Sequence, residues 1–166
     1  MPPSSSSRST ILVVDDEPAV LNLVKLILEA AGYSVLAASN GQQALAFCEN
    51  QNRAIDLLLT DINMPCISGL ELACQVSEIV PHVAVMFMTG SRRDIPGFEF
   101  LRRDGPFSDC EVISKPFTSF ELLAEVAGIV STALRVTMRG TDRVDDAAEK
   151  HRTQTGGGLS DFHSGI

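Results

Sequence analysis

Aromatic and basic side chains are scarce in this sequence of 166 residues. It contains no Trp, one Tyr and eight Phe, and 13 Lys and Arg stand against 21 Asp and Glu, for a formal charge of −8. Stacking of nucleic-acid bases needs aromatic rings, and neutralising phosphates or docking on an anionic bilayer needs a basic face. We therefore expect neither nucleic acid nor membrane as a partner.

Long apolar runs and cysteine pairs are also lacking. No stretch approaches about 18 uninterrupted apolar residues, and the first residues, MPPSSSSRS, are followed by neither the apolar h-region nor the small-residue cleavage site of a signal peptide. We therefore expect neither a transmembrane helix nor a signal peptide. The four cysteines form no CxxC pair, which argues against a zinc site and favours free thiols in a reducing cytoplasm. Cys66, in an expected loop, is a weak candidate for a reactive thiol.

The chain does have enough hydrophobic residues, 45%, to bury the core of one domain. Residues 1–9 are rich in Ser and Pro and are expected to be disordered, and residues 135–166 are expected to form a flexible tail. Residues 10–134 form the expected domain. Within it, short apolar runs occur at residues 11–14, 33–37, 55–60, 83–88 and 111–114.

These runs alternate with segments that carry helix-start signals. Three runs are apolar on both faces, as in a parallel sheet covered by helices on both sides. Capping boxes are predicted at Ser39–Gln42, Ser68–Glu71 and Thr118–Glu121, and Pro18 suits the first turn of a helix. The fourth helical segment is weak because Pro96 interrupts it early. The pattern predicts a (βα)5 chain, and hence a doubly wound α/β fold.

Polar residues follow the apolar runs, at the strand ends where open α/β sheets bind ligands. Asp15 and Asp16 follow the first run, Asp61 the third, Thr89 the fourth and Lys115 the fifth. Neighbouring carboxylates repel each other, and a hard cation such as Mg²⁺ (or Mn²⁺) relieves that repulsion. The Lys ammonium and the Thr hydroxyl can hold phosphoryl oxygens. The set therefore predicts a phosphoryl site with a carboxylate nucleophile.

Signatures of other phosphate or acyl chemistry are missing, since the sequence has no GxxxxGK[ST] loop, no GxGxxG after the first run and no GxSxG elbow. Each candidate residue also has a simpler explanation. Asp15 and Asp16 can cap the first helix, Asp61 can be a loop acid, and Thr89 and Lys115 can be a solvated strand end. These explanations would require four coincidences at one edge of the sheet.

Four motifs, taken in order, resemble those of two-component response-regulator receiver domains. They are ILVVDDEPAVL (11–21), LLLTDINMPCISGLEL (57–72), VMFMTG (85–90) and ISKPF (113–117). The resemblance covers about residues 10–134 and implies a flavodoxin-like fold of five parallel strands in the order 2-1-3-4-5. It also implies a stand-alone receiver, because the residues after 134 are too few and too polar for a helix-turn-helix output domain.

The resemblance implies a role for each site residue. Asp61 would be the phosphoacceptor, Asp15 and Asp16 would bind Mg²⁺ together with Asp61 and the backbone carbonyl of Asn63, and Thr89 would turn toward the phosphoryl oxygens.

Lys115 would pair with the phosphoryl group, and Pro116 matches the cis-proline position of the family. Pro65 and Gly69 match the loop that shapes the exit from the third strand. Two features depart from the family pattern. Val112 stands where a switch aromatic is usual, and the segment from Thr89 to Lys115 is several residues longer than usual.

We therefore expect a receiver that accepts a phosphoryl group from a sensor histidine kinase or a histidine phosphotransfer protein and signals to an unidentified downstream protein. Such a chain promotes its own phosphorylation and dephosphorylation without turning over external substrates, and homodimerisation stays open. One alternative, favoured by Val112, is a pseudo-receiver adaptor that is not phosphorylated. Another is a phosphatase of the haloacid dehalogenase kind, which Asn63 disfavours because those enzymes place an acid there.

Overall fold

A computed structural model describes residues 8–50, 54–90 and 105–133 of the protein. The chain divides into a compact unit, Met1–Ser131, and a second unit, Thr132–Ile166. The predicted N-terminal segment over residues 1–9 lies largely outside the described residues, and the predicted tail over 135–166 lies wholly outside them. The weak fourth helical segment and most of the long Thr89–Lys115 connection also lie outside them.

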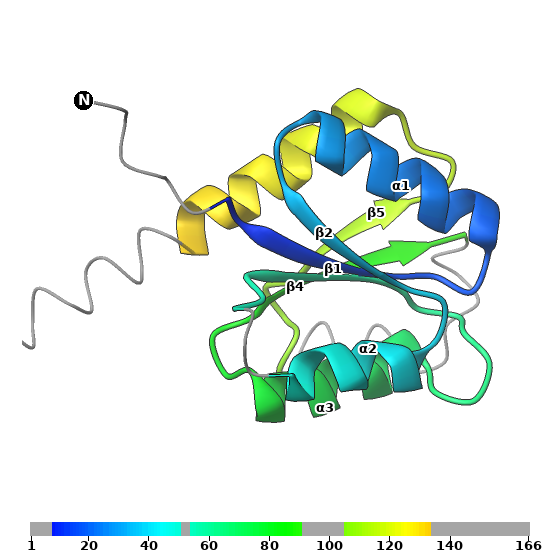
Figure 1. Ribbon diagram of the computed structural model, residues 1–166, viewed down its shortest axis with the longest axis vertical. Coiled ribbons are helices and arrows are strands. Elements are labelled where there is room, and N and C mark those ends of the chain that lie inside the picture. The colour runs from blue at the N-terminus through cyan, green and yellow to red at the C-terminus, as the bar shows by residue number, and fades with distance from the viewer. Residues whose placement is uncertain (1–7, 51–53, 91–104, 134–166) are drawn as a thin grey trace, which may run out of the picture. The chain divides into compact units, whose positions relative to one another are not determined.

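Five parallel strands form one sheet in the order β2-β1-β3-β4-β5, which confirms the predicted fold class and strand order (Figure 1). Because all the strands are parallel, their carboxyl ends lie at one edge of the sheet. The strands are β1 (Thr10–Val14), β2 (Ser34–Ala38), β3 (Leu57–Asp61), β4 (Ala84–Thr89) and β5 (Glu111–Ser114).

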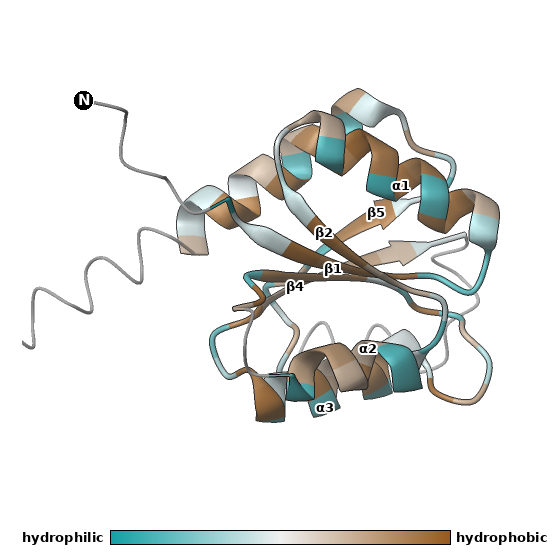
Figure 2. Cartoon of the chain, viewed as in Figure 1, coloured by the Kyte–Doolittle hydropathy of each residue, from teal (hydrophilic) through white to brown (hydrophobic). Residues whose placement is uncertain are grey.

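Helices cover both faces of this sheet (Figure 1). α1 (Pro18–Ala30) and the helix over residues 119–133 lie on one face, and α2 (Gly41–Glu49) and α3 (Gly69–Ile79) lie on the other. Successive buried side chains of β1, β3 and β4 enter the two apolar clusters in turn, so these strands are apolar on both faces. Figure 2 shows the hydrophobic character of the central strands. The cores on the two sides fix the strands that carry the site.

Two of the three predicted capping boxes are confirmed. The Ser68 hydroxyl accepts a hydrogen bond from the Glu71 backbone N–H, and the Glu71 carboxylate accepts one from the Ser68 N–H. Thr118 and Glu121 make the same reciprocal pair at the start of the helix over residues 119–133. Pro18 occupies the first turn of α1, as predicted.

The predicted box Ser39–Gln42 is wrong by one residue. Asn40 is the N-cap of α2, and its side chain accepts a hydrogen bond of 2.9 Å from the Gln43 N–H. The Gln43 side chain in turn accepts one of 2.9 Å from the Ser39 N–H. Ser and Asn are both good caps, and the chain has two adjacent glutamines, so local preference does not select between the two registers.

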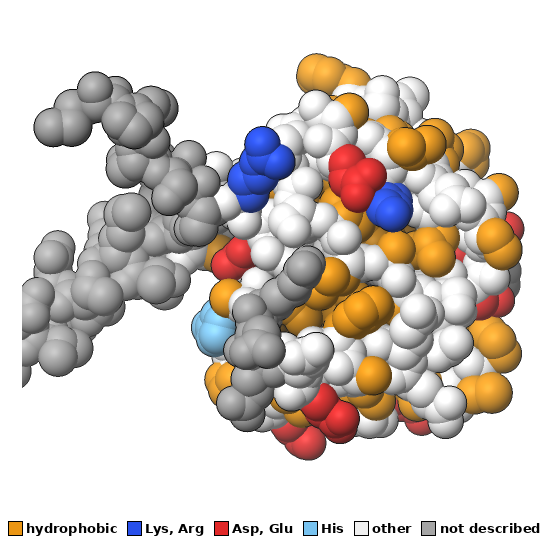
Figure 3. Space-filling view, viewed as in Figure 1, with side chains coloured by type: hydrophobic (Ala, Val, Ile, Leu, Met, Phe, Trp, Pro, Cys, Tyr) orange, Lys and Arg blue, Asp and Glu red, His pale blue; other side chains and the backbone are white. Residues whose placement is uncertain are grey.

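Part of the apolar surface of α1 faces solvent. Leu23 and Leu26 are exposed there, as are Lys25 and Glu29, which form an ion pair. Figure 3 shows apolar and charged side chains next to one another on the face of the molecule that it presents. Val24 and Leu28, in contrast, are fully buried against the sheet. Within the described residues, no helix combines the length and the apolar character needed to cross a bilayer.

Candidate functional site

Four of the predicted site residues lie at the carboxyl edge of the sheet. Asp61 and Thr89 are the last residues of β3 and β4, Asp15 directly follows β1, and Lys115 directly follows β5. The side chains of Asp15, Asp61 and Thr89 are buried although they are polar. Asp16, the next residue after Asp15, is exposed. Burial of several polar groups at one point costs folding free energy unless they pair with one another or with a ligand.

Backbone hydrogen bonds extend the strand pairing through this edge. The Lys115 N–H donates to the Thr89 carbonyl at 2.7 Å, and the Ile62 N–H donates to the Met88 carbonyl at 3.1 Å. The Asp15 N–H donates to the Ala38 carbonyl at 3.2 Å. These hydrogen bonds fix the backbone of the site residues at the ends of the strands, and so fix the positions from which their side chains extend.

The ammonium group of Lys115 lies among three carboxylates. Its Nζ is 2.7 Å from Asp15 Oδ2, 3.5 Å from Glu17 Oε1 and 3.6 Å from Asp61 Oδ2. The Lys115 side chain is 15% exposed and Asp15 is fully buried, so their short contact is shielded from solvent. This pair joins residues that are 100 positions apart in the sequence and closes the site between β1 and β5.

Burial and the neighbouring charges shift the pKa of two groups at the site. Burial raises the pKa of Asp61, with further increases from Asp15 and Asp16, while Lys115 opposes the shift. Burial lowers the pKa of Lys115, but the hydrogen bond to Asp15 and the charges of Asp61, Asp15 and Glu17 outweigh it and raise the pKa overall. Lys115 therefore stays charged at neutral pH and favours the ionised form of Asp61.

The donor set fits a hard divalent cation. Carboxylate oxygens of Asp15, Asp16 and Asp61 lie within 4.8 Å of one another. Three carboxylates contact the ammonium of Lys115, and Asp16 adds a fourth to the acidic group, so the site carries a local excess of negative charge. Oxygen ligands in a partly open site suit Mg²⁺, which keeps several waters and binds phosphate oxygens.

The simpler explanation, that Asp15 and Asp16 only cap the first helix, does not account for these contacts. Asp15 Oδ1 accepts a hydrogen bond of 2.9 Å from the Glu17 N–H, but Glu17, the N-cap of α1, has no capping bond of its own. The other oxygen of Asp15 contacts Lys115 across the sheet. Asp15 thus has one local contact and one contact that belongs to the site.

Gly69 packs directly against the backbone of Asp61. A Cβ atom at this position would lie 2.0 Å from the Asp61 carbonyl oxygen and 2.9 Å from the Cα of Ile62. The Gly69 N–H donates to the Ile62 carbonyl at 2.9 Å. A side chain at position 69 would therefore displace the residue that the sequence marks as the nucleophile.

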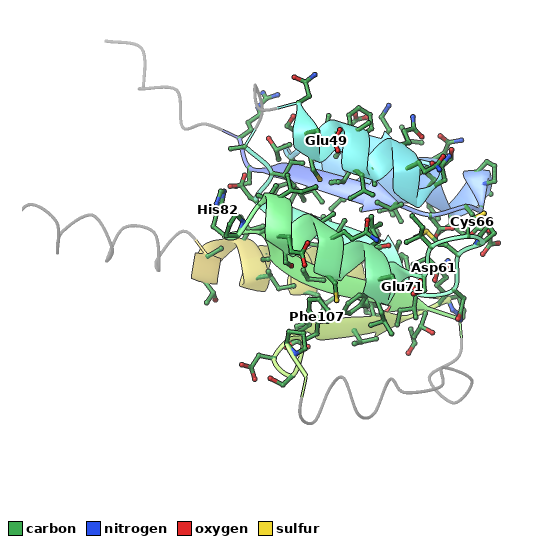
Figure 4. All side chains as sticks on the ribbon, turned by 90° about the horizontal axis from the view of Figure 1, so that it is seen from below. Glu49, Asp61, Cys66, Glu71, His82 and Phe107 are labelled. Carbon is green, nitrogen blue, oxygen red and sulfur yellow. The ribbon has the colours of Figure 1, made fainter. Side chains whose placement is uncertain are left out.

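The loop between β3 and α3 holds the other predicted residues of this region. Asn63 and Pro65 are exposed, and the Pro65 carbonyl accepts a hydrogen bond of 2.9 Å from the Ile67 N–H. Cys66 is exposed and has a φ of 71°, which a residue other than Gly seldom adopts. Figure 4 shows Asp61 and Cys66 at the same end of the sheet.

Two residues that contact the site, Glu17 and Thr60, were not predicted from the sequence. Glu17 lies beside Lys115. Its position directly after Asp15 and Asp16 in the sequence could have indicated this role. Thr60 is buried, and its hydroxyl donates to the Asp61 carbonyl at 3.0 Å. A threonine inside a strand is ordinary by composition, so no local signal separates this one from the rest.

Val112 occupies the position of the expected aromatic and lies beside Phe87 in the sheet register. It is partly buried and packs into the cluster on the α2 and α3 face. The ring of Phe107, from the turn before β5, packs edge-on against Phe87 with centroids 5.6 Å apart. Lys115 and Pro116 are joined by a cis peptide bond.

Comparison with known proteins identifies one family. Residues 11–127 match the family described as the response regulator receiver domain. The chain is 30% identical over 163 residues to the transcriptional regulatory protein TrcR of Mycobacterium tuberculosis, covering 95% of this chain and 61% of TrcR. It is 36% identical over 123 residues to the response regulator receiver protein CpdR of Brucella abortus, covering 74% of this chain and 98% of CpdR.

The solved structures agree with the sequence relatives. The CheY-like receiver domain protein of Methanospirillum hungatei matches with a TM-score of 0.68 and 30% identity, over 78% of this chain and 98% of that one. The chain spans about half the length of several other curated relatives, which are transcriptional regulatory proteins. The match therefore concerns the receiver part of those longer proteins.

Proposed function

The chain belongs to the response regulator receiver domain family, and from this premise we propose that Asp61 accepts a phosphoryl group. The donor is a phosphohistidine of a sensor histidine kinase or of a histidine phosphotransfer protein. The observation that carries the proposal is the setting of Asp61, a buried carboxylate 3.6 Å from the Lys115 ammonium and clustered with Asp15 and Asp16.

In the proposed step, an ionised oxygen of Asp61 attacks phosphorus while the bond from phosphorus to the donor nitrogen breaks. Lys115 supports the attack because it favours the ionised form of Asp61 against the effect of burial. Mg²⁺ or Mn²⁺, held by Asp15, Asp16, Asp61 and the Asn63 carbonyl, would neutralise charge on the phosphoryl oxygens.

Phosphorylation replaces the single charge of the Asp61 carboxylate with a phosphoryl group that carries about −1.5 to −2 charges and three acceptor oxygens. Lys115 and Thr89 receive this charge in the proposal, and they are linked directly through the hydrogen bond from the Lys115 N–H to the Thr89 carbonyl. A change at either residue is thus passed to the ends of β4 and β5. The output is a changed protein surface that a downstream protein, or a second copy of the chain, recognises.

The same proposal places the chain in the cytoplasm as a signalling protein without turnover of external substrates, which accelerates only its own phosphorylation and dephosphorylation. The four cysteines are free, as is usual in a reducing compartment. Val112 favours a second candidate, an adaptor with the same fold that is not phosphorylated, because a valine cannot act as a rotating aromatic.

Incubation with acetyl phosphate, followed by intact-mass measurement, separates the two candidates. We expect one added phosphoryl group in the presence of Mg²⁺ and none in EDTA. The variant Asp61→Asn should gain none under either condition, whereas Glu49→Gln, which removes an exposed carboxylate of α2, should behave like the wild type. Absence of an adduct with acetyl phosphate and with phosphorylated kinases would favour the adaptor.

A further inference from the structure

A groove lies at the amino ends of β4 and β5, opposite the end of the sheet that carries Asp61. This groove of about 590 Å³ is bounded by the second half of α3, the start of β4 and the turn that precedes β5. Figure 4 shows Phe107, one of its lining residues, away from Asp61 and near α3. At about 3.3 Å per residue, the length of β4 separates the groove from the phosphoryl site by roughly 15 Å.

The groove has an apolar floor and an acidic rim. Val83, Val85, Phe107 and Ile129 contribute to the floor. The rim consists of three exposed carboxylates, Glu78 on α3, Asp109 in the turn and Glu111 on β5.

No Lys, Arg or His is among the described residues that line the groove. The acidic rim therefore presents one sign of charge around an apolar surface.

The rim acids do not form a metal site. Among the described residues, Asp15, Asp16 and Asp61 are the one group of acids, cysteines or histidines close enough to share an ion. The rim acids instead come from three separate elements and surround the floor. Such spacing complements several positive charges spread along one ligand, and the volume of the groove falls within the range of about 300–1,000 Å³ found for ligand pockets.

We propose that this groove binds a basic amphipathic segment of a partner protein. The apolar side chains of the segment cover the floor, and its Lys or Arg side chains pair with Glu78, Asp109 and Glu111. Helices that place an apolar face in a groove are a common mode of peptide recognition. This site is separate from Asp61, so binding there does not depend on the proposed phosphorylation.

The probe for this proposal is a fluorescein-labelled peptide of roughly 15 residues, with Leu at helical spacing and Lys elsewhere, which gives about four helical turns. Its anisotropy is measured with the full chain at low ionic strength, beside a control peptide in which Glu replaces each Lys. We expect saturable binding of the Lys peptide, weakened by salt, and none of the control.

Matched variants locate the binding. Glu78→Gln combined with Glu111→Gln should raise the Kd at least twofold, since each exposed ion pair contributes modestly. Glu49→Gln combined with Glu125→Gln removes the same charge from two exposed positions outside the groove and should leave the Kd unchanged. An equal loss in both double variants would show non-specific attraction and overturn the proposal.

Two exposed cysteines provide a second measurement in the wild-type chain. Cys74 lines the groove, whereas Cys66 lies in the loop beside Asp61. The Lys peptide should slow alkylation of Cys74 and leave Cys66 unaffected, as mapped by mass spectrometry. Unchanged labelling of Cys74 at saturating peptide would refute the groove as the binding site, whatever the outcome of phosphorylation assays.

Discussion

Replacement of Gly69 by Ala tests the close contact between α3 and the Asp61 backbone. The added Cβ would lie 2.0 Å from the Asp61 carbonyl oxygen, far inside van der Waals contact, and the neighbour is backbone that cannot rotate away. The chain must therefore shift by more than 1 Å at a point where the Gly69 N–H also donates to Ile62. Overpacking of this kind costs about 1–3 kcal/mol, and the weakened hydrogen bond adds about 1 kcal/mol.

The expected loss is therefore about 2–4 kcal/mol of unfolding free energy, or a fall in Tm of roughly 8–16 °C for a domain of this size. Circular dichroism measures the Tm during heating and the unfolding free energy in urea. Gly128→Ala is the matched control, because a Cβ there would meet no atom within 4 Å apart from its chain neighbours and the backbone of its own helix, which covers residues 119–133.

In a helix interior Ala is favoured over Gly, so the control should gain about 0.5–1 kcal/mol. The same shift should slow phosphorylation of Gly69→Ala, since it displaces Asp61. A Gly69→Ala protein as stable as the wild type, or one less affected than Gly128→Ala, would refute the packing argument.

Three further predictions concern the charges and thiols. Lys115→Met leaves the buried Asp15 without its ammonium partner, so in EDTA the variant should lose about 3 kcal/mol in urea unfolding, and Mg²⁺ should restore more stability to it than to the wild type. Burial raises the pKa of Asp61, so the folded state binds its proton more tightly than the unfolded state, and ionisation costs stability as pH rises. Asp61→Asn should therefore raise Tm in EDTA at pH 7, with an advantage that vanishes below the ordinary carboxylate range; a constant advantage at all pH values contradicts this. Burial, with Asp109 and Glu111, raises the pKa of Cys110 to about 11, so at pH 8 an alkylating reagent should modify the exposed Cys66 well before Cys110.

The alternation of strands and helices and the edge that carries the site could be predicted from local signals, whereas the order of the strands followed from the family resemblance. An apolar run followed by a charged residue can be recognised without tertiary information, and Asp61 and Lys115 do lie at the ends of the strands β3 and β5. Strand limits were less predictable. Ile55 is buried yet lies before β3, because burial also occurs where the chain enters the sheet.

Other features depend on packing that local sequence does not encode. The edge-on contact of Phe107 with Phe87 brings together a turn and a strand, and nothing in the Gly105–Pro106 sequence marks the next residue as buried. The apolar floor beneath the acidic rim depends on the same arrangement. Gly69 matched a family loop, but the reason that it must be Gly is a contact with Asp61, which is visible only in three dimensions.

Chemical trapping of the phosphorylated residue tests the central claim most directly. Borohydride reduces an acyl phosphate on Asp to homoserine, so treatment of the protein after incubation with acetyl phosphate and Mg²⁺, followed by peptide mass spectrometry, identifies the acceptor. Asp61 is a buried carboxylate 3.6 Å from the Lys115 ammonium, whereas the buried Asp15 already holds that ammonium at 2.7 Å. We predict homoserine at position 61 alone, and none in EDTA. Homoserine at Asp15, Asp16 or another acid, with Asp61 intact, would contradict the account.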